Sequence, residues 1–119
     1  MKCEDIKIKV RTDFSESPGP RRPDEGDNSG EEFRKNVLLP ALQRAVSNKV
    51  QLIVDLDNTD GFGTSFLEES FGGLIRHNGY TEKQLKNTLV IISDEWSDYI
   101  DEINLYIAIA EQKEAAKRK

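Results

Sequence analysis

Apolar residues alternate with basic ones at the start of the chain and form continuous runs further along it. Ile6, Ile8 and Val10 recur with a period of two, which predicts a half-buried strand. The run 50–56 (VQLIVDL) is apolar and β-branched with little alternation, which predicts a strand covered on both faces. The run 88–93 (TLVIIS) predicts a second buried strand.

Three other segments carry the apolar spacing of amphipathic helices. The first covers about 31–47, and Pro40 inside it should kink the helix because proline removes a backbone hydrogen bond. The second begins at Thr64, and the third covers about 96–117 with Trp96 on its apolar stripe. Strands that alternate with helices predict an α/β fold whose buried strands run parallel through right-handed crossovers.

Segment 15–30 (SESPGPRRPDEGDNSG) holds three prolines, three glycines and four acids, which predicts a loop. A loop of this length is usually either functional or disordered, and the sequence leaves both alternatives open. At its end, Ser29 and Glu32 have the spacing of a capping box, so we expect Ser29 to begin the first helix.

Length and charge restrict the class of protein. The 119 residues are enough for one domain, 1–119, with a single core. A net charge of -5, with only scattered bases, disfavours nucleic acid as a partner. No apolar run approaches the ~20 residues that span a bilayer, so no membrane association is expected. Cys3 is the sole cysteine, which fits a cytoplasmic location.

The stretch between the second strand and the second helix gathers the candidate functional residues. Hydroxyls, carboxylates and turn glycines meet there, in Asp57, Asp60, Gly61, Gly63, Thr64 and Ser65. Thr64 and Ser65 stand at a helix start, where N–H groups are unpaired and an anion is stabilised. The favoured interpretation is that one of the two caps the helix, which is compatible with an exposed hydroxyl open to phosphorylation.

Other chemistry receives less support. Asp55, Asp57 and Asp60 offer oxygen ligands for Mg²⁺, but a turn-forming role suits them better. The glycines match neither a P-loop nor a dinucleotide fingerprint, and His77 is the only histidine. We therefore expect no enzyme activity and no cofactor. Arg21 and Arg22 in the loop offer a clamp for a phosphate or a partner carboxylate.

Two motifs give the chain a family resemblance. Residues 28–34 (NSGEEFR) and 63–74 (GTSFLEESFGGL) resemble the bacterial STAS-like domains of unknown function, over roughly residues 6 to 110. Those domains are similar to the STAS domains of anti-sigma-factor antagonists, in which a partner kinase with a histidine-kinase-like ATPase fold phosphorylates a serine at a helix start. The resemblance implies a mixed sheet of about four strands with helices packed on it. It also implies that Ser65 corresponds to the phosphorylatable serine of the antagonists and Thr64 to the aspartate that precedes that serine.

Two functions of different classes remain. The preferred one is a non-enzymatic regulatory module that binds a protein partner, such as a histidine-kinase-like ATPase, and is switched by phosphorylation of Ser65. The alternative is a small-ligand or nucleotide-binding domain that uses the helix N-terminus at Thr64 and Ser65. The position of Arg21 and Arg22 separates them, because a loop folded over Ser65 would favour a small ligand.

Overall fold

The computed structural model describes residues 4–117, so Cys3 lies outside the described residues. Its centre is a sheet of three parallel strands in the order β1 (Ile6–Lys9), β2 (Leu52–Asp55) and β3 (Leu89–Ile92). The expected α/β fold is confirmed. The expected sheet of about four mixed strands is wrong for the described residues, which form three strands, all parallel.

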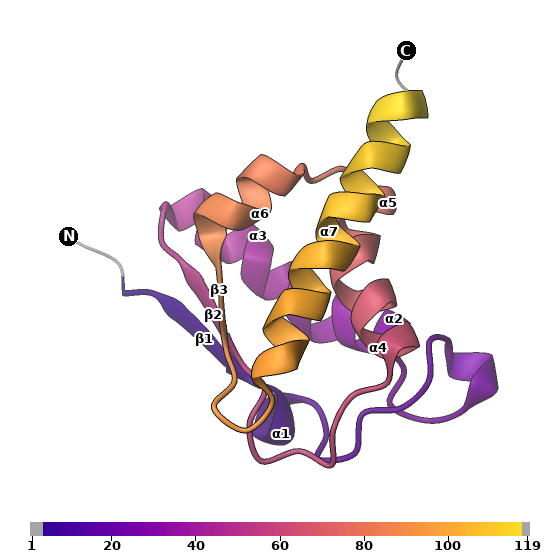
Figure 1. The fold of residues 1–119 in the computed structure, drawn as a ribbon. Coiled ribbons are helices and arrows are strands. Elements are labelled where there is room, and N and C mark those ends of the chain that lie inside the picture. The colour runs from indigo at the N-terminus through magenta and orange to yellow at the C-terminus, as the bar shows by residue number, and fades with distance from the viewer. Residues whose placement is uncertain (1–3, 118–119) are drawn as a thin grey trace.

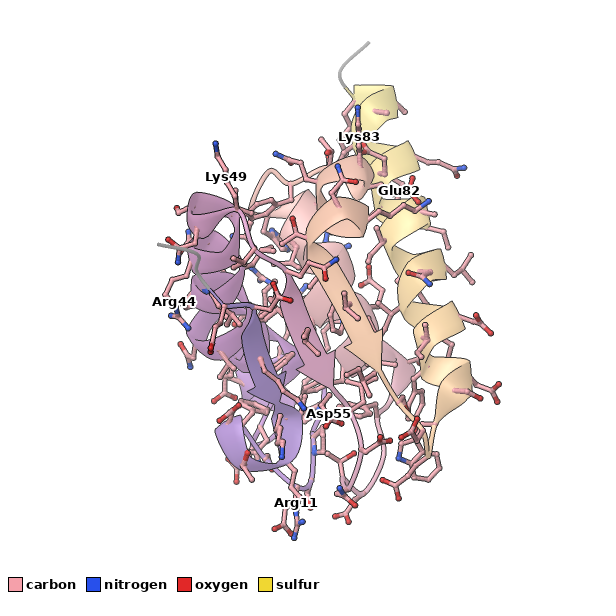
Figure 2. All side chains as sticks on the ribbon, turned by 90° about the vertical axis from the view of Figure 1, so that its left-hand side faces the viewer. Arg11, Arg44, Lys49, Asp55, Glu82 and Lys83 are labelled. Carbon is pink, nitrogen blue, oxygen red and sulfur yellow. The ribbon has the colours of Figure 1, made fainter. Side chains whose placement is uncertain are left out.

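One face of this sheet carries the helices and the other is open. Strand order follows chain order, so two right-handed crossovers return on the same side of the sheet. Figure 1 shows the long helices on that side, and Figure 2 looks directly onto the strands with no helix in front. The prediction that β2 is covered on both faces is therefore wrong. Leu52 and Val54 are buried toward the helices, while Ile53 and Asp55 on the open face are only half-buried.

The first predicted helix is present and unbroken, but its middle is π-helical. It runs through α2 (Gly30–Phe33), the π-helical segment η2 (Arg34–Leu38) and α3 (Leu39–Asn48). Pro40 is the second residue of α3, directly after the π turn. Because Pro40 has no N–H to donate to the carbonyl of residue 36, the helix widens at this point.

The second helix repeats this design. It comprises α4 (Thr64–Leu67), the π-helical segment η3 (Glu68–Gly72) and α5 (Gly73–Arg76). Its apolar side is buried as the spacing predicts, with Phe66, Leu67, Phe71 and Leu74 all nearly inaccessible. α7 (Ser97–Lys117) packs across η3 and α5 and buries Ile103, Ile107 and Ala110.

Three short elements have no counterpart among the predictions. They are α1 (Val10–Asp13), the 3-10 turn η1 (Pro23–Glu25) inside the long loop, and α6 (Glu82–Thr88). Thr81 caps α6 by accepting the N–H of Gln84, whose side chain accepts the N–H of Thr81 in return. Within residues 4–117, no helix combines the length and apolar character needed to cross a membrane.

Candidate functional site

Thr64 and Ser65 occupy the first turn of α4, and neither caps the helix. The N-cap is Gly63, with φ -76° and ψ 154°, so no side chain accepts a hydrogen bond at this end. The capping role predicted for Thr64 or Ser65 is therefore wrong, because the residue that precedes the helix is a glycine. Both hydroxyl residues are exposed. We refer to residues 57–65 as the α4 corner.

Asp57 holds the α4 corner to the segment that follows β3. Its two carboxylate oxygens accept the N–H groups of Asp94, at 3.0 Å, and Glu95, at 2.9 Å. Its own N–H donates to a carboxylate oxygen of Asp55 at 3.0 Å. Asp57 therefore forms turns at the carboxyl ends of β2 and β3, as its sequence context indicates. No described group of three or more His, Cys, Asp or Glu side chains is arranged to hold a metal ion.

Asp60 joins the α4 corner to the loop 15–30. Its N–H donates to the carbonyl of Glu16 at 2.7 Å, and the hydroxyl of Ser17 donates to its carboxylate at 2.5 Å. Gly61 follows with φ 108°, a left-handed conformation that favours glycine. Hydrogen bonds therefore hold the start of the loop beside the α4 corner.

A row of aromatic rings leads from the core to the surface beside the α4 corner. Phe66 is buried against Phe62, whose ring meets Tyr99 edge-on at 5.4 Å between centroids. The Tyr99 hydroxyl accepts the N–H of Phe62 at 3.0 Å. Trp96 ends the row, 5.7 Å from Tyr99, and is 38% exposed although its position on the apolar stripe predicts burial. The residue precedes the first turn of α7, so it lies outside the packed helix face.

The surface around Trp96 is acidic. Glu95, Asp98 and Glu102 line a hollow beside the ring, and Asp60 and Asp94 are exposed on the two segments that Asp57 joins. Neither 50–75 nor 87–112 contains a lysine, an arginine or a histidine. The α4 corner and the start of α7 therefore expose aromatic and acidic side chains, and segments 50–75 and 87–112 supply no basic side chain to neutralise the acids.

Arg21 lies against the second helix rather than at Ser65. Its guanidinium donates to Glu68 at 2.5 Å and to Glu69 at 3.4 Å, both on η3. Arg22 is exposed, forms no ion pair within the described residues, and its backbone N–H donates to Glu25 at 3.0 Å. The loop is therefore ordered, and Ser65 stays exposed beside it.

Glu68 and Glu69 belong to an ion cluster that the sequence did not reveal. Arg76 contacts Glu68 at 2.7 Å, and Arg34 contacts Glu69 at 3.1 Å with both side chains 3% exposed. Arg34 also donates to Asn78 at 2.9 Å. The cluster joins the two π-helical segments, since Arg34 opens η2 and both glutamates lie in η3.

Gly72 and Gly73 make room for these charges. A Cβ atom on Gly73 would lie 2.6 Å from Nε of Arg34, and one on Gly72 would lie 2.6 Å from a carboxylate oxygen of Glu68. Both distances are far below van der Waals contact. The adjacent glycines are therefore the sequence feature from which a close approach at this point of the helix could have been predicted.

The cluster shifts the pKa values of Glu68, Arg21 and the neighbouring His77. Burial by itself raises the pKa of Glu68, but hydrogen bonds from Arg76 and Arg21 outweigh it and the pKa lies below its ordinary value. The hydrogen bond to Glu68 raises the pKa of Arg21. Burial and the charge of Arg34 lower the pKa of His77. These pKa shifts favour the charged forms of Glu68 and Arg21 and the neutral form of His77.

Ser29, the remaining candidate, is buried and has a structural role. Its hydroxyl accepts the N–H of Glu32 at 3.1 Å, and the carboxylate of Glu32 accepts the N–H of Ser29 at 3.2 Å. The predicted capping box is confirmed. The hydroxyl is enclosed and serves the start of α2.

Comparison with known protein families identifies the family of the chain. The model of the family described as STAS-like domain of unknown function (DUF4325) matches residues 29–98, more than half of the chain. The match begins at the Ser29 cap and ends just after Trp96, so it contains the α4 corner and most of the ion cluster. No curated protein and no solved structure matches the chain.

Proposed function

The chain belongs to the family of STAS-like domains of unknown function, and from that premise we propose that it is a non-enzymatic regulatory module that binds a protein partner through the α4 corner. The observation that carries the proposal is the exposure of Thr64 and Ser65. Their hydroxyls are free of the capping role that such residues usually have at a helix start.

The aromatic row supplies the apolar part of a docking surface. Trp96 is partly exposed and backed by Tyr99 and Phe62, so its ring is presented on a firmly packed base. Tryptophan and tyrosine are enriched among the residues that contribute most to protein–protein binding energy. Contact with Trp96 would therefore anchor a partner on the segment that Asp57 ties to the α4 corner.

The acidic residues define the chemistry of that partner. Glu95, Asp98 and Glu102 line a hollow together with the ring, and complementary charge governs the rate and specificity of association. The partner would present lysine and arginine side chains around an apolar pocket. By resemblance to the anti-sigma-factor antagonists, a histidine-kinase-like ATPase is the class we propose.

Phosphorylation of Ser65 would regulate the contact. Ser65 is the second residue of α4, where the helix N-terminus stabilises added negative charge within the protein itself. Across the interface, the phosphate would add bulk and hydration to a surface formed for close contact. Phosphorylation is therefore expected to favour the free protein over the complex.

Mass spectrometry tests the modification directly. The protein is incubated with the histidine-kinase-like ATPase encoded nearest to its gene, together with ATP and Mg²⁺, and the modified residue is located by fragmentation. Phosphate on Ser65, absent in Ser65→Ala and retained in Thr64→Ala, is the expected result. An unmodified Ser65, together with ATPase binding that Ser65→Asp leaves unchanged, would refute the proposal.

A further inference from the structure

The outer edge of β1 has backbone groups with no strand beside them. β1 is an outer strand of the sheet, and the N–H of Ile6 donates inward to Gln51 on the β2 side at 2.9 Å. The N–H of Lys9 donates instead to the carboxylate of Asp13 at 2.8 Å, away from β2. Backbone groups alternate in direction along a strand, so the N–H and C=O of Lys7 also point away from β2. Lys7 therefore offers an unpaired donor and acceptor at this edge.

An apolar shelf lies next to these groups. A groove of about 330 Å³ separates β1 from η2 and α3, and Ile6, Ile8, Val37, Pro40 and Ala41 form its apolar lining. Val37 and Pro40 remain half-buried, although they lie on the side of the helix that faces the sheet. A strand added beside β1 would cover both side chains, in the way that β1 and β2 cover the rest of α3.

Unpaired cations surround the groove. Lys7 and Lys9 are exposed and belong to the open face of the sheet, and Arg44 lines the groove from α3 (Figure 2). Within the described residues none of the three forms an ion pair, and the carboxylate of Asp13 is occupied by the N–H of Lys9. The three cations exceed the two carboxylates nearby, those of Asp13 in the groove and of Asp55 opposite Lys9, so this edge keeps a small excess of positive charge.

We propose that the edge of β1 binds an extended segment of a partner protein, in which acidic and apolar side chains alternate, as a fourth strand. The backbone of the segment would pair with Lys7. Its apolar side chains would cover Val37 and Pro40, and its acidic side chains would stand beside Lys7 and Lys9 on the open face. This surface is separate from the α4 corner, and the proposal is independent of the proposed function.

A second copy of the chain fits this edge poorly. In β1 both positions on the open face are lysines, Lys7 and Lys9. Pairing two copies of β1 edge to edge would place lysine opposite lysine, and like charges directly opposite one another destabilise a sheet. Lysine on an edge strand is also a common protection against such self-association. The charge pattern therefore selects an acidic segment over a second β1.

Titration with a synthetic peptide tests the proposal. The probe is a short fluorescent peptide in which valine alternates with glutamate, and binding is measured by anisotropy and by the backbone amide shifts of β1. The key variant is Lys7→Pro, which removes the outward N–H without removing a bond of the β1–β2 ladder. We expect at least a tenfold loss of affinity in Lys7→Pro and a smaller loss in Lys7→Gln, which keeps the N–H. The matched control is Lys83→Gln on α6, which removes an exposed charge away from the groove and should bind the peptide unchanged.

Several results would overturn the proposal. Absence of saturable binding would do so, as would equal affinity for a peptide with lysine in place of glutamate. A dimer in light scattering that Lys7→Pro converts to a monomer would show that a second copy occupies the edge. Should Lys7→Pro lower the unfolding midpoint, Val37→Asp provides the second variant, because the apolar side chains of the bound segment would bury its carboxylate without a partner. Unchanged binding in a folded Val37→Asp protein would also refute the proposal.

Discussion

Substitution of Gly73 by alanine perturbs the ion cluster with a single methyl group. The new Cβ would lie 2.6 Å from Nε and 2.8 Å from Cδ of Arg34. Arg34 has no room to withdraw, because its side chain is 3% exposed and is held by Glu69 at 3.1 Å and by Asn78 at 2.9 Å. The methyl group should therefore displace the guanidinium and break its contact with Glu69.

Two opposing effects determine the size of the change. Breaking a buried ion pair costs about 3–5 kcal/mol, because a charge is left without its partner. Alanine in place of glycine inside a helix stabilises by about 1 kcal/mol. The net loss in the free energy of unfolding should be about 2–4 kcal/mol. For a chain of this length, that corresponds to a fall of roughly 10 °C in the unfolding midpoint.

Urea denaturation followed by circular dichroism measures this change, and Gly63→Ala is its matched control. Gly63 has φ -76°, which alanine adopts readily, and a Cβ there would meet no atom within 4 Å. The control should lose less than about 1 kcal/mol, through the weaker N-cap preference of alanine. If Gly73→Ala is as stable as the wild type, or more stable, the close approach of Arg34 does not stabilise the fold and the reasoning fails.

Three further predictions concern stability. Ser29→Ala should lower the free energy of unfolding by about 1–2 kcal/mol, since it removes the buried capping oxygen of α2. A loss of less than about 0.3 kcal/mol, measured by urea denaturation, would contradict this prediction. Lys49→Gly should raise the free energy of unfolding by about 0.5–1 kcal/mol, because Lys49 has the left-handed conformation (φ 57°, ψ 42°) that glycine adopts at lower cost. Thermal unfolding should show a higher midpoint for this variant. Stability should also fall as the pH decreases, in two ranges. The pKa of His77 is depressed, so the unfolded state takes up the proton first as the pH drops through the ordinary value of 6.5. The pKa of Glu68 is also depressed, so its contribution is present above 4.5 and is lost as the pH falls through the lower, folded value; a flat profile of unfolding midpoint against pH would contradict both statements.

Features that depend on local spacing were predictable from the sequence. Alternation at Ile6 and Ile8 identified β1, the apolar runs identified β2 and β3, and the Ser29–Glu32 spacing identified the start of α2. Each of these signals acts over a few neighbouring residues. The same kind of signal was present at Thr81 and Gln84, which form a capping box before the unpredicted helix α6.

Features that depend on tertiary contacts were not predictable in this way. Arg34 and Glu69 are 35 residues apart, and only the packing of η2 against η3 brings them together. The number of strands, and the open face beside Ile53 and Asp55, depend on which elements pack on the sheet rather than on the strand sequence. At the α4 corner, the sequence located the hydroxyls correctly, but it assigned the cap to Thr64 or Ser65, one or two residues too late, because Gly63 has no side-chain oxygen to mark it.

The α4 corner contains residues with a structural role and an exposed hydroxyl residue without one. Asp57 and Asp60 build the turns and attach the loop, whereas Ser65 is exposed and does not cap α4. Asp57→Ala should therefore disturb the fold, whereas Ser65→Ala should leave it intact. Because substitution of Ser65 should not disturb the fold, a change in binding by a Ser65 variant would report on the contact itself.

The most direct test of the proposed function is the affinity of a histidine-kinase-like ATPase partner for three forms of the protein, measured by isothermal titration calorimetry. The forms are the wild type, Ser65→Asp and Ser65→Ala, with Trp96→Ala to test whether the start of α7 belongs to the contact surface. We predict that Ser65→Asp and Trp96→Ala each weaken binding by at least about tenfold, or about 1.4 kcal/mol, while Ser65→Ala binds like the wild type. Equal affinity of Ser65→Asp and the wild type would contradict the account.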